Sequence, residues 1–216
     1  MTKLSYDDRG REAYACTLAV QEQLVQAVAQ SPQDTAHLLL VEHDPPVITL
    51  GRSANAANVL APTATLEREG ITIHQTARGG DVTYHGPGQL VAYPILRINQ
   101  HAGGAREYLR LLEQAIIGTL SEFGIEGRRE AGYTGVWVGQ EKVAAIGVAI
   151  RRWVSYHGLA LNVCPNLAHF GLIVPCGITD KKVTSMTKLL GREVQVDEVK
   201  PVLAKWLTNV LGFEND

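Results

Sequence analysis

Three cysteines are the most nucleophilic side chains in this chain of 216 residues, at positions 16, 164 and 176. An odd number with no C-x-x-C spacing argues against a disulfide framework or a zinc site, so we expect three reduced thiols. Cys176 stands between Pro175 and Gly177, on a predicted turn that would expose its sulfur. Cys16 falls on the apolar side of a predicted helix and Cys164 ends a predicted strand, so both are expected to be packing residues. Cys176 is therefore the best candidate nucleophile.

Lys142 is the second position that points to chemistry. The chain has seven lysines and thirteen arginines, and between residues 4 and 180 every one of these cations except Lys142 is arginine. A lysine amine can lose its proton when it is buried, whereas a guanidinium does not, so a need for a titratable group would explain the exception. Drift in composition explains the count equally well.

The glycine-rich segment 78–88 has the sequence RGGDVTYHGPG. It lacks the GK[ST] of a phosphate-binding loop and does not open a helix as a GxGxxG motif does. Glycines let a backbone approach a bulky group closely, and Arg78, Tyr84 and His85 are polar groups able to orient a ligand. Structural turns account for the glycines equally well, so the segment is a candidate binding site.

The hydrophobic pattern predicts helices that alternate with strands. Amphipathic helices are predicted at 11–29, 105–123 and 197–211. Strands are predicted at 37–43, 46–52, 71–75, 89–98, 135–139, 142–150 and 155–163. We expect the first two strands to be joined by a turn at Asp44-Pro45-Pro46 and the last three to form an antiparallel meander. The predicted fold is α+β, a mixed β-sheet with helices packed on it.

Composition excludes several classes of protein. A hydrophobic content of 45% and a charged content of 19% suit one compact domain, or at most two small ones, and argue against disorder, collagen and coiled coil. No apolar run reaches the roughly 18 residues that span a bilayer, and the first residues lack the apolar stretch of a signal peptide. We therefore expect a cytoplasmic protein without a membrane partner. A net charge of −2 offers no basic field for nucleic acid, and no metal or cofactor motif is present.

Four blocks of the sequence, in this order, resemble the octanoyltransferases of lipoate synthesis, a family also called lipoate-protein ligase B. The blocks are RGGDVTYHGPGQLVAYPI (78–95), GVWVGQEKVAAIGVAIRR (135–152), SYHGLALNV (155–163) and PCGI (175–178). The similarity extends from Gly51-Arg52 almost to the C-terminus. It implies one catalytic domain over residues 1–216 with the fold of the biotin and lipoate protein ligases, a mixed sheet flanked by helices.

The resemblance also implies an activity, its partners and its site residues. The activity is transfer of an octanoyl group from octanoyl-acyl carrier protein to a lysine on lipoyl domains of 2-oxoacid dehydrogenase complexes or on the glycine cleavage H protein. The implied acyl-thioester residue is Cys176, and the lysine that assists it is Lys142. The implied substrate-binding residues are Arg78, Gly79, Gly80, Asp81, Val82, Thr83, Tyr84, His85, Ala145, Ile146, Gly147, Gly158, Leu159 and Ala160. Position 145 is often Ser in the family, so Ala145 leaves only backbone contacts implied there.

The chemistry of octanoyl transfer suits these residues. Conversion of a thioester into an amide is downhill, so it needs neither ATP nor another cofactor. A free thiol with a pKa of about 8.5 is only a few per cent thiolate at pH 7. An adjacent ammonium would favour the thiolate and could then protonate the leaving thiol. The competing arrangement is a Cys–His pair with His85 or His157 as the base.

An octanoyl chain also needs an apolar slot and a protein partner needs a docking surface. Candidate slot residues on two neighbouring predicted strands are Val143, Ile146, Val148, Leu159 and Leu161, with Gly147 and Gly158 opening space. Burial of seven alkyl carbons at about 0.8 kcal/mol each contributes roughly 5 to 6 kcal/mol. The candidate docking pairs for an acidic acyl carrier protein are Arg151-Arg152, Arg128-Arg129 and Lys181-Lys182, although most such pairs are solvated surface.

Two other functions remain as alternatives. An ATP-dependent lipoate or biotin protein ligase of the same fold would form an acyl-adenylate and would need no nucleophilic thiol. A non-catalytic acyl-binding protein would be expected to lack Lys142 or Cys176. Both residues are present, which favours the transferase.

Overall fold

The computed structural model describes residues 4–174 and 182–214. Its strands are β1 (Leu4–Glu12), β2 (Ala36–His43), β3 (Val47–Leu50), β4 (Thr72–Gln75), β5 (Val82–His85), β6 (Gln89–Ile95), β7 (Val136–Val138), β8 (Glu141–Arg151), β9 (Val154–Asn162) and β10 (Lys182–Val183). Its α-helices are α1 (Tyr14–Gln30), α2 (Thr63–Arg68), α3 (Ile98–His101), α4 (Ala105–Glu122), α5 (Met186–Leu190) and α6 (Val196–Val210). Each predicted helix and strand has a counterpart among these elements.

The strands form two mixed sheets. The larger sheet has the order β1-β2-β6-β9-β8-β10, with β7 also paired to β8. In this sheet β1 is parallel to β2 and β10 is parallel to β8, and the other pairs are antiparallel. The smaller sheet has the order β4-β3-β5. The mixed sheet and the antiparallel meander β7–β8–β9 confirm the predicted fold class.

The strands β2 and β3 follow one another across Asp44-Pro45-Pro46 as predicted, but they do not pair, because they belong to different sheets. The connection contains Pro45 and Pro46, and the peptide bond between Asp44 and Pro45 is cis. Two consecutive residues without an N–H cannot continue a hydrogen-bonded ladder, so the chain leaves the larger sheet here. β3 then pairs with β4 and β5 instead.

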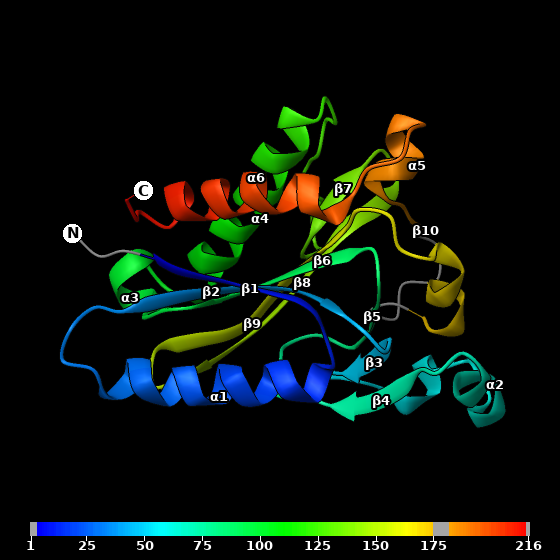
Figure 1. The fold of residues 1–216 in the computed structure, drawn as a ribbon, viewed down its shortest axis with the longest axis horizontal. Helices are drawn as coiled ribbons and strands as arrows, with labels where there is room; N and C mark the ends of the chain where they lie inside the picture. The colour runs from blue at the N-terminus through cyan, green and yellow to red at the C-terminus, as the bar shows by residue number, and fades with distance from the viewer. Residues whose placement is uncertain (1–3, 175–181, 215–216) are drawn as a thin grey trace.

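Helices cover both faces of the larger sheet (Figure 1). α1 packs against β9 and β6 on one face, and α4 and α6 pack against each other and the opposite face. A large apolar core fills the space under α4 and α6, and a smaller core lies between the sheet and α1. A third core lies under the smaller sheet. No helix in the described parts of the chain is both long and apolar enough to cross a membrane.

The buried side of α1 differs by one residue from the predicted side. Its buried residues are Tyr14, Thr17, Gln21, Val25 and Val28. Cys16 is exposed, so its predicted place in the core is wrong. Gln21 can be buried because its Oε1 accepts the backbone N–H of His157 at 2.8 Å. The buried side of α1 thus includes a hydrogen-bonded glutamine, whereas the sequence pattern predicted an entirely apolar side.

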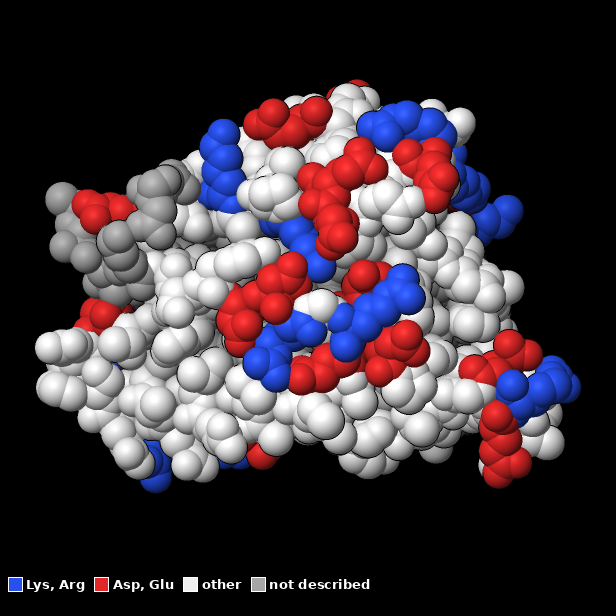
Figure 2. Space-filling model, in the orientation of Figure 1, with Lys and Arg blue, Asp and Glu red and all other residues white. Residues whose placement is uncertain are grey.

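The hydrophobic pattern did not predict β1, because this strand lies at the edge of the sheet and carries mostly polar side chains. Its charged residues bond locally: Arg9 to Glu12 at 2.6 Å and Lys200 of α6 to Asp8 at 3.1 Å. Figure 2 shows this face, where basic and acidic side chains lie against one another over β1. Charged edge strands are a common defence against unwanted strand pairing. The short elements α2, α3, α5 and β10 were also missed.

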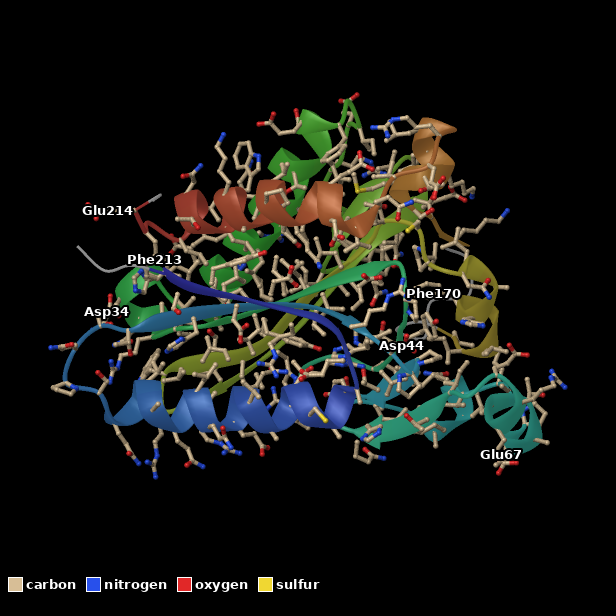
Figure 3. All side chains as sticks on the ribbon, in the orientation of Figure 1. Asp34, Asp44, Glu67, Phe170, Phe213 and Glu214 are labelled. Carbon is tan, nitrogen blue, oxygen red and sulfur yellow. The ribbon has the colours of Figure 1, made fainter. Side chains whose placement is uncertain are left out.

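Contacts around His101 fasten the end of the chain to the body of the fold. His101 Nε2 lies 2.9 Å from the carboxylate of Asp34, and its ring stacks 4.2 Å from that of Phe213. Asp34 and Phe213 are far apart in the sequence and lie on the same side of the molecule (Figure 3). These contacts join the α1–β2 connection, α3 and the residues after α6.

Replacement of Gly158 tests how tightly β6 and β9 are paired. A Cβ at this position would lie 2.1 Å from the carbonyl oxygen of Ala92, a backbone atom that cannot rotate away. We expect Gly158→Ala to lower the free energy of unfolding in urea by about 2 kcal/mol or more. Gly171→Ala, whose added methyl meets nothing within 4 Å, is the control and should stay within about 0.5 kcal/mol of the wild type. Equal losses in the two variants would contradict this account.

Candidate active site

A cavity of about 710 Å³ lies along one edge of β8. Beyond Ala144, the side of β8 that faces away from β9 pairs with no strand in residues 4–174 and 182–214. The cavity is lined there by β8 itself, by the segment 78–80, by the first turns of α4 and by the loop 132–134. Its volume falls within the range of about 300–1,000 Å³ that is usual for small-molecule sites.

The family pattern implied sixteen residues, of which the structure describes fifteen, and twelve of these line the cavity. They are Arg78, Gly79, Gly80, Thr83, His85, Lys142, Ala145, Ile146, Gly147, Gly158, Leu159 and Ala160.

 The sixteenth implied residue, Cys176, lies outside the part of the chain that the structure describes. The cavity therefore gathers residues from three of the four sequence blocks.

Asp81, Val82 and Tyr84 do not line the cavity. Along β5 successive side chains point to opposite faces of the sheet, so Thr83 and His85 face the cavity while Val82 and Tyr84 enter the core of the smaller sheet. Asp81 is engaged elsewhere, because its carboxylate accepts the backbone N–H of Asn55 at 3.0 Å and bonds the side chain of Asn58. The family pattern covers a continuous run, of which the cavity receives residues 78–80 and only alternate residues of β5.

The segment 78–80 is held over the edge of β8 by Arg78. The Arg78 guanidinium is buried and donates to the Thr49 carbonyl at 2.6 Å, to the Thr49 hydroxyl at 2.9 Å and to the Gly79 carbonyl at 3.1 Å. The Gly79 N–H donates to the Val148 carbonyl of β8 at 2.8 Å. Gly147 leaves room for this contact, since a Cβ there would lie 3.0 Å from Arg78 Cδ. The segment thus bridges β3 of the smaller sheet and β8 of the larger one.

Lys142 lies near the start of β8, between two paired strands. It is opposite Trp137 of β7 and Val183 of β10, and its carbonyl accepts the Thr184 N–H at 2.9 Å. Its Nζ is 5.4 Å from the centroid of the Trp137 ring, a distance suited to a cation–π contact. The backbone on both sides and the indole ring together restrict where the amine can lie.

Gly135 packs against the Lys142 side chain and is itself held by a buried ion cluster around Glu113. A Cβ at Gly135 would lie 2.6 Å from Lys142 Cε, so only glycine leaves space for the lysine stem. The Gly135 N–H donates to the Glu113 carboxylate at 3.2 Å. Glu113 is 1% exposed and is paired with Arg110 at 2.6 Å and Arg129 at 3.0 Å. A buried carboxylate with both partners in place fixes the position of the loop against the lysine.

The two cysteines that the structure describes are remote from the cavity lining. Cys16 is exposed on α1, and Cys164 is half-buried, where burial raises the pKa of its thiol. On either side of residues 175–181, Val174 donates its N–H to the Asn58 carbonyl at 2.8 Å and Lys182–Val183 pair with Glu141–Lys142. The strand β10, which begins directly after residues 175–181, therefore lies beside Lys142.

The predicted apolar slot is divided between the cavity and the core. Ile146, Val148 and Leu159 line the cavity, whereas Val143 and Leu161 are fully buried in the core under α4 and α6. Gly158 lines the cavity, but the close approach of the Ala92 carbonyl is what requires a glycine there. Further apolar lining comes from Val91, Leu109 and Ile150, which the prediction did not include.

Buried histidines contribute polar groups to the same cavity. Burial lowers the pKa of His85 to about 3 and that of His157 to about 4, so both rings are neutral near pH 7. Gln89 donates its amide N–H to Asn162, so its oxygen is left to accept a hydrogen bond from the Nδ1–H of His85 at 2.7 Å. His157 Nε2 is buried and has no hydrogen-bond partner within the described residues. The two rings can orient a ligand, whereas their low pKa values make them weak bases at neutral pH.

Several lining residues were not predicted from the sequence, because they come from elements distant in the chain. They are Tyr14 of α1, Thr49 of β3, Tyr93 of β6 and Tyr133 of the loop before β7. Thr49 and Tyr93 interrupt otherwise apolar strands, a signal that could have marked them. No group of three or more His, Cys, Asp or Glu side chains in residues 4–174 and 182–214 is arranged to hold a metal ion.

The fold is shared with protein ligases of known structure. A structure described as lipoate-protein ligase A bound with ATP superposes with a TM-score of 0.82 at 18% identity, covering 99% of this chain and 88% of that one. A biotin protein ligase from Aquifex aeolicus in complex with biotin and ATP gives a TM-score of 0.57 at 14% identity, covering 97% and 70%. At these identities the likeness concerns the fold alone.

Sequence relatives carry the likeness further. Residues 13–208 match the lipoyl protein ligase A/B catalytic domain. The octanoyltransferase of Solibacter usitatus is 52% identical over 207 residues, covering 95% of this chain and 91% of the relative. That of Desulforamulus reducens is 43% identical over 213 residues, covering 98% and 92%. Identity at this level across nearly the whole length confirms the resemblance of the four sequence blocks, and the chain belongs to the octanoyltransferases of the lipoyl protein ligase A/B catalytic-domain family.

Proposed function

We propose that this protein transfers an octanoyl group from octanoyl-acyl carrier protein to a lysine of lipoyl domains, through a thioester on Cys176 assisted by Lys142. The acceptors are lipoyl domains of 2-oxoacid dehydrogenase complexes and the glycine cleavage H protein, and the reaction takes place in the cytoplasm. Residues 1–216 act as one catalytic domain, which the match over residues 13–208 supports. The observation that carries the proposal is an apolar cavity with Lys142 in its lining, in a chain 52% identical to an octanoyltransferase.

The cavity has the composition that an octanoyl group requires. Small side chains at Ala145, Gly147 and Ala160 leave the space open, and Ile146 and Leu159 supply apolar walls. Burial of an octanoyl chain against such walls contributes about 0.8 kcal/mol for each methylene group. An acyl chain shorter by several methylenes would therefore bind more weakly by several kcal/mol.

In the first step the Cys176 thiolate attacks the donor thioester carbonyl, and the phosphopantetheine thiolate leaves. The Lys142 ammonium stabilises the Cys176 thiolate beforehand and gives its proton to the departing thiolate. The products are the S-octanoyl enzyme, a neutral Lys142 amine and the free thiol of the carrier. One thioester replaces another in this step, so it requires no ATP.

In the second step the amine of the acceptor lysine attacks the S-octanoyl carbonyl. The neutral Lys142 amine takes the proton that the attacking nitrogen loses, and the Cys176 thiolate leaves as the amide forms. The thiolate and the ammonium are thereby restored for the next cycle. Contacts of Lys142 with Trp137 and Gly135 support this role by holding the amine in one place.

Replacement of Cys176 tests the covalent intermediate. After incubation with octanoyl-acyl carrier protein, intact mass spectrometry should show one octanoyl group on the wild-type protein and none on Cys176→Ala or Cys176→Ser. Cys164→Ser is the control and should acquire the adduct, because Cys164 does not line the cavity. Unchanged turnover by Cys176→Ala, or turnover that depends on ATP, would exclude the mechanism.

Replacement of Lys142 tests the proton transfer. Lys142→Arg keeps a positive charge but removes the titratable amine, so we expect the rate of octanoyl transfer to fall by about 10²-fold or more, as on loss of a general acid–base group. Lys188→Arg, an exposed lysine paired with Glu141, is the control and should keep wild-type activity. Activity of Lys142→Arg close to that of the wild type would refute the proton-transfer role.

The buried histidines predict how stability depends on pH. The pKa of His157 is about 4 in the folded protein and about 6.5 in the unfolded chain. Between these two pH values the unfolded chain binds the proton more readily than the folded protein, so protonation favours unfolding. We expect the free energy of unfolding in urea to fall as the pH is lowered from 7 to 5. His157→Asn should make this decline shallower, since asparagine tolerates the left-handed backbone at this position, where φ is 56°. An equally steep decline in the variant would contradict the assignment.

A further inference from the structure

Most arginines of the described chain have an acidic partner close by. Arg9 bonds Glu12, Arg68 bonds Glu69 and Arg192 lies 3.9 Å from Glu198. The face shown in Figure 2 illustrates this pairing, with basic and acidic side chains in contact. The near-neutral net charge of −2 thus includes many locally neutralised pairs.

Four exposed arginines have no ion pair within residues 4–174 and 182–214, and we call them the arginine rim. They are Arg52, Arg106, Arg151 and Arg152. Their exposure and lack of acidic partners leave their positive charge available to a binding partner.

The arginine rim borders the cavity. Arg52 lines it directly, Arg106 stands on α4 between the lining residues Ala105 and Leu109, and Arg151 follows the lining residue Ile150. The charged residues among the described lining are all cationic, namely Arg52, Arg78 and Lys142. The nearby carboxylate of Glu107 accepts the Gly103 N–H at 2.9 Å. The charged residues in the described cavity lining are therefore all positive, and the border adds Arg106, Arg151 and Arg152 beside the carboxylate of Glu107, a balance that favours the approach of an anionic partner.

The turn between β8 and β9 adds a second feature of a binding surface. Arg152 and Trp153 occupy this turn with φ of 51° and 67°, a conformation that usually selects Asn or Gly. Trp153 is 59% exposed, and Ile150 on the same hairpin is also exposed. Tryptophan and arginine are the side chains most enriched at protein interfaces.

The three basic pairs that the sequence suggested for docking differ in whether they have acidic partners within the described residues. Arg128 is bonded to Glu130, and Arg129 is bonded to the buried Glu113, so this pair is used within the protein. Lys181 lies outside the described residues. Within residues 4–174 and 182–214, Arg151-Arg152 has no acidic partner, and it follows the lining residue Ile150.

We propose that the arginine rim, together with Trp153, is the docking surface for the acidic carrier protein that presents the octanoyl thioester. This inference rests on the proposed function and assigns the surface to the donor rather than to the lipoyl acceptor. The donor must deliver its thioester through the border of the cavity, where unpaired arginines attract an acidic surface and speed association.

Charge reversal combined with two donors tests the proposal. Acylation of Cys176 is measured in single turnovers with octanoyl-acyl carrier protein and with octanoyl-N-acetylcysteamine, a neutral thioester without a protein. For Arg151→Glu/Arg152→Glu we expect the second-order rate constant with the carrier protein to fall about ten-fold or more and its salt dependence to weaken. The rate with the small thioester should not change. Arg151→Lys/Arg152→Lys should stay near wild type with both donors.

A matched double reversal away from the cavity controls for net charge. Arg68→Glu/Arg192→Glu changes the charge by the same amount and should leave both donors within about two-fold of wild type. Equal losses with the two donors, or no loss with the carrier protein, would overturn the docking proposal. A defect confined to transfer from the acylated enzyme to a lipoyl domain would also overturn it, because the surface would then serve the acceptor. If wild-type protein accepts octanoyl from neither donor, the proposed function itself fails, and the docking proposal fails with it.

Discussion

The buried guanidinium of Arg78 is the interaction on which the cavity depends. It donates to Thr49 of β3 and to the Gly79 carbonyl, and the Gly79 N–H donates to Val148 of β8. An arginine stays charged even when it is buried, so it is stable inside a protein only where acceptors surround it. Its bonds therefore tie the smaller sheet to the edge of the larger one. The space between these two parts is the cavity.

The strands β8 and β9 line the cavity and also contribute to the apolar core, so the shape of the cavity and the packing of the core depend on the same strands. On β8, Ile146 and Val148 reach the cavity while Val143 is packed under α4 and α6. On β9, Leu159 lines the cavity while Leu161 is core. Close-packed interiors respond to changes of a single methylene group. A substitution meant to alter the acyl slot will therefore often alter the stability of the fold as well.

Charges are paired on one part of the surface and mainly positive around the cavity, a difference that the net charge does not show. Over β1 and α6, basic and acidic side chains neutralise one another locally. Around the cavity, Lys142 and the arginine rim supply positive charge, while burial keeps His85 and His157 neutral near pH 7. Neutral rings and fixed cations together make the site receptive to an acidic partner that carries an apolar group.

The sequence by itself determined the family, the fold class, the main helices and strands, and Lys142 as an exceptional residue, because long blocks and clear periodicities carry that information. Only the tertiary structure decided which side of each element is used. Cys16 proved exposed because the buried side of α1 lies one residue further along, at Thr17, Gln21 and Val25, and β5 presented only alternate residues of its motif. Tyr14, Thr49 and Tyr93 reached one cavity from distant parts of the chain. Local patterns specify the period of an element, whereas its phase and its neighbours depend on packing between segments far apart in sequence.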